Sequence, residues 1–237
     1  MFFIDPSSHE IGRSPSSAPA AFTPSVRCGI GIDADDFRLS PTASSERFSF
    51  HLLRAGSPLL AGYWQLRSDI FCQEQHLFEA SDRDELDKIA YPIVAINHSL
   101  APEQVKWQAQ RKGQGQFQAQ GQSQGQVQVQ GQAVGVVRIL EQSPRVWYGG
   151  RLGVDINFRR HNQIGKGLIW KAVTTANGWG CDQFLATVQQ QNVRFFQRLH
   201  WQSIEQLEIR GIAHQLMQAD LSYYQPAREC RPALVAA

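Results

Sequence analysis

The sequence predicts a single α/β (α+β) domain with a mixed, largely antiparallel sheet flanked by helices. Short apolar runs such as 91–97 (YPIVAIN) and 134–140 (VGVVRIL) have the length and composition of buried strands. Apolar residues recur at helical spacing from Ile164 to Ala176. The 237 residues are enough for one domain with a substantial core and tails.

The first half of the pattern combines strands with one helix. Residues 48–53 (FSFHLL) alternate as a half-buried strand does, and 63–76 carry apolar residues at the spacing of a helix. The two buried strands 91–97 and 134–140 follow. The order strand, helix, strand, strand is therefore expected up to residue 140.

The second half begins with a strand at 146–154, in which Gly149 and Gly150 make a bulge or a splay natural. The helix from Ile164 comes next. We expect the remaining elements to be a strand at 184–188, a short helix at 193–199, and a closing hairpin of strands at 204–209 and 214–221.

Two segments lie outside this pattern. Residues 1–47 are rich in Ser, Pro and Ala, which predicts a flexible leader. Residues 107–133 carry Gln at almost every second position, with polar or small residues between, so neither face of a strand would be buried. We predict a disordered insertion there, with a long exposed hairpin as the alternative. The domain would then span 48–224, followed by a tail at 225–237.

Composition excludes several classes of function. A net charge of +2 from 23 basic and 21 acidic residues predicts no binding of nucleic acid or of a membrane surface. The four cysteines are scattered, with no paired spacing and no histidine at ligand spacing, so neither disulfides nor a metal site is expected. No signal peptide or membrane span is apparent, and we expect a cytoplasmic protein.

The loop between the strand 146–154 and the following helix carries the candidate chemistry. Gly165 and Gly167 stand at the start of the helix, with Arg159, Arg160 and Lys166 nearby. Free backbone N–H groups and the helix dipole at such an N-terminus bind a pyrophosphate. The spacing matches neither a Rossmann fingerprint nor a P-loop.

Several segments resemble the GNAT superfamily of N-acetyltransferases. LGVDINFRRHNQIGKGLIWKAV resembles its pyrophosphate loop, and NVRFFQRLHW and AHQLMQADL resemble later segments. LRSDIFCQEQHLFEASDRDELD resembles members whose first helix reads Arg-x-x-Ile-Phe-x-x-Glu-Gln, a pattern seen distantly in acyl-homoserine-lactone synthases. The resemblance covers about residues 48–221 and implies a GNAT-like sheet.

The resemblance implies transfer of an acetyl group from acetyl-CoA, or of another acyl group from its CoA ester, to the amine of a small molecule by direct attack. It implies no metal site, and it is compatible with a homodimer. The residues implied for the cofactor are Leu152, Val154, Arg159, Arg160, Gln163, Ile164, Gly165, Lys166, Gly167 and Asn192. Those implied for the acceptor are Arg67, Phe71, Glu74, Asp84 and His214.

The groups that would move protons are less defined. Glu141 and Asp155 are candidate bases, although solvated turn carboxylates are the plainer interpretation. Phe196 stands where many family members place a tyrosine acid, so the general acid is unassigned, and Asn162 replaces the usual first residue of the loop. Two other functions stay open: acyl transfer of the autoinducer-synthase kind, with long acyl groups and S-adenosylmethionine, and a non-catalytic acyl-CoA-binding module.

Overall fold

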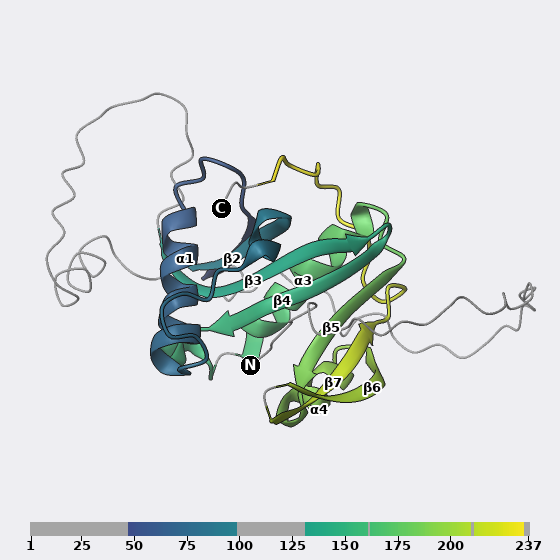
Figure 1. Cartoon of the computed structure of the whole chain (residues 1–237). Coiled ribbons are helices and arrows are strands. Elements are labelled where there is room, and N and C mark those ends of the chain that lie inside the picture. The colour runs from purple at the N-terminus through teal and green to yellow at the C-terminus, as the bar shows by residue number, and fades with distance from the viewer. Residues whose placement is uncertain (1–46, 99–130, 161, 210, 235–237) are drawn as a thin grey trace, which may run out of the picture.

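The computed structural model describes residues 47–98, 131–160, 162–209 and 211–234 (Figure 1). The predicted flexible leader and most of the predicted insertion lie outside these residues. None of the described helices is long and apolar enough to cross a membrane.

One mixed sheet organises the described chain. Its strands follow the order β1-β2-β3-β4-β5-β7-β6, and each neighbouring pair is antiparallel except β4 and β5, which run parallel. The predicted fold class is confirmed. The strands are β1 (Phe48–Leu52), β2 (Ala90–Asn97), β3 (Gln132–Ser143), β4 (Val146–Val154), β5 (Gln183–Gln189), β6 (Trp201–Ile209) and β7 (Ile212–Ala219).

Helices cover both faces of the sheet (Figure 1). α1 (Leu60–Ser68) continues into a π-helical turn, η3 (Asp69–Glu74), and packs on β2 and β3 from one side. α3 (Asn162–Gly178) packs on β1 to β4 from the other side. The shorter elements are α4 (Val193–Gln197) and the 3-10 turns η4 (Glu85–Lys88), η5 (Ile156–Phe158) and η6 (Gln190–Asn192).

Alternation along the strands produces two cores, because successive side chains point to opposite faces. Ile93, Val137 and Ile139 face α3, where they pack with the apolar stripe of that helix. Val94, Ile96 and Val136 face α1. We call these two sides the α3 face and the α1 face.

The predicted elements are all present, with shifted ends. The expected helix at 63–76 is divided between α1 and η3, and the first strand of the closing hairpin begins at Trp201. β3 begins at Gln132, so the last two residues of the predicted insertion belong to a strand. Gln132 pairs with Asn97, which closes the β2–β3 ladder at the point where the described chain is interrupted.

A close approach between α3 and β1 requires glycine at position 167. A Cβ built on Gly167 would lie 2.1 Å from the ring of Phe50 in β1. A Cβ on Gly165, half a turn earlier, would meet no atom closer than 3.7 Å. The two glycines of the predicted loop therefore have different structural roles.

We predict opposite effects of alanine at these two positions. Gly167→Ala should lower the free energy of unfolding by about 1–3 kcal/mol, because α3 or Phe50 must move. Gly165→Ala should be neutral or stabilising by about 0.5–1 kcal/mol, because alanine favours the helix. Urea unfolding measures both changes, and equal stability of the two variants would contradict the packing role of Gly167.

Candidate functional site

The two parallel strands at the centre of the sheet separate along their length. β4 pairs with β5 at Val146–Tyr148 opposite Gln183–Leu185, and the ladder between them ends there. β4 then continues to Val154 along β3, and β5 continues to Gln189 along β7. The facing edges of Gly149–Val154 and Ala186–Gln189 can therefore bind an extended ligand through backbone hydrogen bonds, in the way that a sheet edge binds an added strand.

A bulge in β4 accompanies this separation. Val136 pairs with Gly153 and Arg138 pairs with Gly150, so Arg151 and Leu152 together stand opposite Val137. Arg151 has a φ of 51°, in the left-handed region. The irregularity predicted at Gly149 and Gly150 thus lies one residue later, at an arginine.

The N-terminus of α3 lies beside the open end of this separation, because the chain leaves β4 at Val154 and enters α3 eight residues later. Arg160, Gln163 and Lys166 are exposed around it. The guanidinium of Arg159 bends away, donating to the carbonyl of Val154 at 2.9 Å and to Glu74 at 2.6 Å. Exposed cations thus surround a helix N-terminus, which is the arrangement that favours an anion.

Other residues predicted for the cofactor contribute backbone or packing rather than side-chain contacts. The side chain of Ile164 is fully buried in the core, where it touches the α3 face at Gly135. Leu152 is buried on the same face, and Val154 packs against it. Asn192 occupies the N-cap position of α4, without a side-chain capping hydrogen bond, and is half-buried.

Three arginines and three aspartates form a buried ion cluster on the α1 face. Arg67 of α1 donates to Asp82 at 2.7 Å and to Asp87 at 2.6 Å. Arg138 of β3 holds both carboxylate oxygens of Asp84, at 2.6 and 2.8 Å. The Arg–Asp cluster consists of Arg67, Arg138, Arg151, Asp82, Asp84 and Asp87.

The charges in the Arg–Asp cluster determine one another's ionisation. Burial by itself would raise the pKa of Asp87, but hydrogen bonds and charge from Arg67 and Arg138 hold it below its usual value. Burial, and then the charge of Arg138, lowers the pKa of Arg151 to about 10, so Arg151 stays charged at neutral pH. Asp87 and Arg151 are therefore both charged near pH 7.

The predicted acceptor residues divide into buried and accessible ones. Arg67 and Phe71 have no exposed surface, so a ligand cannot touch them in this structure, and they support the site from behind. The side chain of Asp84 is 33% exposed. His214 is buried opposite Gln189, at the open end of β5, and its Nδ1 donates to the carbonyl of Ile212.

A surface pocket of about 290 Å³ lies on the α1 side of the loop that follows β4. It is lined by three carboxylates, Asp69, Glu74 and Asp155, together with Leu66, Ile70, Gln73, Ile156 and Asn157. The carboxylate of Asp155 accepts from the backbone N–H of Asn157 at 2.9 Å. An acidic pocket of this kind favours a cationic ligand.

Glu141 lies at the wrong end of the sheet to act with this loop. It is opposite Trp147, where β4 and β5 are still paired, and it accepts from the backbone N–H of Arg145. That hydrogen bond lowers the pKa of Glu141, and Arg231 of the C-terminal segment pairs with it at 2.8 Å. Glu141 is therefore a paired turn carboxylate away from this loop, and its role as a base stays a prediction.

A tyrosine that the sequence did not indicate lies where the pairing of β4 with β5 ends. Phe196, at the position expected for a tyrosine acid, is buried against Trp201 with ring centroids 4.9 Å apart. Tyr148 is the last β4 residue paired with β5, and by strand alternation it faces the α1 side, away from Trp147. Partial burial raises its pKa, so the hydroxyl keeps its proton at neutral pH.

Comparison with known proteins agrees with this architecture. Residues 85–201 match the model of the Acetyltransferase (GNAT) family. The fold is similar to that of a Lactobacillus plantarum protein assigned as an N-acetyltransferase, with a TM-score of 0.53 and 17% identity over 74% of this chain and 99% of that one. It is also similar to Escherichia coli ElaA, with a TM-score of 0.51 and 18% identity over 73% and 99% of the two chains. No curated protein matches.

The Arg–Asp cluster predicts how stability depends on acid. Because the folded pKa of Asp87 is depressed, its contribution is present above about pH 4 and is lost as the pH falls through the folded value. Asp87→Asn should lower the free energy of unfolding by about 3 kcal/mol at pH 7, and this cost should shrink as the pH falls below about 4. Urea unfolding at several pH values measures this.

The exposed Glu85, two residues away, provides the control, since Glu85→Gln removes only a surface pair with Lys88 and should cost less than about 1 kcal/mol at any pH. A cost of Asp87→Asn that does not change between pH 7 and pH 3 would contradict the linkage.

Proposed function

We propose that the chain, in which residues 85–201 match the model of the Acetyltransferase (GNAT) family, binds an acyl-CoA and transfers the acyl group to the amine of a small molecule. The observation that carries the proposal is the separation of β4 from β5 beside the N-terminus of α3. Such a site would hold two parts of CoA. The anionic pyrophosphate would bind at the N-terminus of α3, and the extended pantetheine chain, here called the arm, would lie between β4 and β5.

In this proposal the pyrophosphate lies on the free N–H groups at the start of α3. Arg160, Gln163 and Lys166 are exposed around that end and would add charge and hydrogen bonds. Gly165 has room above its Cα, which allows the ligand to approach the backbone. The arm would then pair with the free edge of β4 between Gly149 and Val154.

The acceptor would approach from the α1 face. The carboxylates of the acidic pocket would attract a cationic amine, and Asp84 is the accessible member of the Arg–Asp cluster on that face. The attacking amine must lose a proton to have a lone pair. Asp155 lies on the wall of the acidic pocket at the end of β4, roughly 20 Å along the strand from Tyr148, so it would attract the amine, and the base that acts at the thioester is unassigned.

Tyr148 is the group that we propose as proton donor to the leaving thiolate. It stands where β4 and β5 part, on the side from which the acceptor comes. Its raised pKa keeps the proton in place until a thiolate forms. This assignment replaces the acid that Phe196 cannot supply.

The test of the function is release of free thiol from acetyl-CoA and longer acyl-CoAs in the presence of a panel of amines. Turnover of acetyl-CoA that depends on one amine would support the proposal. Turnover only with long acyl groups and S-adenosylmethionine would favour the autoinducer-synthase kind of transfer. CoA binding without thiol release from any donor would favour a binding module.

A substitution in the loop tests the position of the cofactor. Gly165→Asp should weaken CoA binding by about a hundredfold or more, because a carboxylate would face the pyrophosphate. Gly165→Asn, which has the same size without the charge, is the matched control and should bind far more tightly than the Asp variant. Isothermal titration measures both affinities, and equal binding by the two variants would place the pyrophosphate elsewhere.

The proton donor is tested by removing one hydroxyl. Tyr148→Phe should reduce kcat by about a hundredfold while leaving the affinity for CoA unchanged, because general acid catalysis typically contributes that much. Steady-state thiol release with the best amine, together with titration of CoA, separates the two effects. An unchanged kcat would exclude Tyr148 as the acid.

A further inference from the structure

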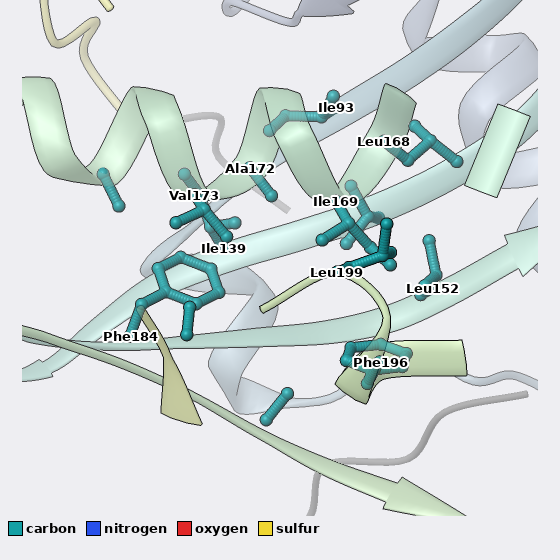
Figure 2. Close-up of a cluster of buried hydrophobic side chains, with 14 of the residues drawn as sticks. Ile93, Ile139, Leu152, Leu168, Ile169, Ala172, Val173, Phe184, Phe196 and Leu199 are labelled. Atoms are coloured by element: carbon teal, nitrogen blue, oxygen red, sulfur yellow. The ribbon is translucent and has the colours of Figure 1, made fainter. Parts of the chain in front are cut away.

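A small apolar cavity lies inside the separation between β4 and β5, on the α3 face. Figure 2 shows Ile169, Ala172 and Val173 directed from α3 towards the strands, with Phe184 and Phe196 on the opposite side. The wall is almost entirely carbon. The lining residues are Val137, Gly149, Leu152, Ile169, Ala172, Val173, Phe184, Ala186, Phe196 and Trp201.

The cavity exists because small residues meet where the strands diverge. Gly149 and Ala186 come from the two separating strands, and Ala172 comes from the helix that covers them. The ring of Phe184 already fills the space above Gly149, since a Cβ there would lie 3.0 Å from it. What remains is about 20 Å³ of free space, which is room for roughly one methyl-sized group.

The residues that line this cavity are not among those proposed to hold the pyrophosphate or to move a proton. The pyrophosphate loop lies at the other end of α3's contact with β4, and Tyr148 and the acidic pocket face the α1 side. An arm that enters between the strands from Val154 travels towards Gly149, and the cavity is the apolar space beside that path. A thioester held between the strands would thus have polar groups on one side and this cavity on the other.

We propose that the cavity receives the end of the acyl chain and sets its length, so that the preferred donor carries a short acyl group larger than acetyl, of three or four carbons. The inference rests on the proposed function. The carbonyl carbon and the next one or two carbons would occupy the separation, and the last carbon would fill the apolar space. In the transfer, the amine nitrogen forms a bond to the carbonyl carbon, the C–S bond breaks, the base takes the proton from nitrogen and the thiolate takes one from the acid.

Binding of a series of donors tests the proposal without knowledge of the acceptor. Isothermal titration with CoA and with its acetyl, propionyl, butyryl and octanoyl esters gives the affinity of each. We expect affinity to rise by about fourfold for each carbon added from acetyl to butyryl, the effect of burying one methylene. Octanoyl-CoA should bind more weakly than butyryl-CoA, because the cavity closes on Trp201 and Phe196.

Two substitutions should move the optimum in opposite directions. Ala172→Leu fills the cavity, so propionyl-CoA and butyryl-CoA should bind no more tightly than acetyl-CoA. Ile169→Ala enlarges the cavity, so the acyl chain that binds most tightly should lengthen to about six carbons. Leu168→Ala is the matched control: it truncates an equally buried residue of the same helix that does not line the cavity. Thermal unfolding verifies that each variant is folded, and either of the two cavity variants alone suffices for the test.

The outcomes of these titrations distinguish failure of the role of the cavity from failure of the proposed function. Affinity for CoA itself with no gain from acetyl to butyryl, or the same chain-length profile in wild type and in the folded cavity variants, would overturn the role of the cavity and leave the proposed function standing. Absence of binding to CoA and to all of its esters would overturn the proposed function, and the role of the cavity with it.

Discussion

The ion pairs of the Arg–Asp cluster are the interaction on which the α1 face depends. Arg67 is fully buried, and so is Arg138, and a buried guanidinium without a partner is strongly destabilising. Their carboxylate partners come from a single segment, 82–87, which these contacts fix between α1 and the sheet. The position of α1, and with it the wall of the acidic pocket, follows from this pairing.

Arg151 connects the cluster to the separation of the central strands. It lies at the bulge of β4, and its guanidinium donates to Asp84 at 2.9 Å and to the carbonyl of Asp82 at 3.2 Å. A non-glycine residue in the left-handed region is held there by its surroundings. We infer that the contacts of Arg151 on the α1 face help to fix the bulge, which redirects β4 where it leaves β5.

Local patterns in the sequence predicted most of the fold. The apolar runs of β2 and β3 and the stripe of α3 determine element type without reference to distant residues. The Arg–Asp cluster could be predicted only in part. Asp82, Asp84 and Asp87 gather close to Arg67 in the sequence, which indicates that they pair. The contact of Arg151 with Asp84 spans 67 positions and has no local signal. The surroundings of Glu141 could not be predicted for a related reason: its sequence position indicates its strand but not its contacts with Arg145 and Arg231. Tyr148 was missed because only the ladder shows where pairing stops.

The pairing of Asn97 with Gln132 has a thermodynamic consequence for the length of the chain. Asn97 and Gln132 lie on one rung of the β2–β3 ladder, so the sheet is continuous across the chain positions between them. Lengthening or shortening such a segment changes mainly the entropy of closing a loop, which grows only as the logarithm of its length. The domain can therefore carry a segment of widely varying size at this point while the strands on either side keep their register.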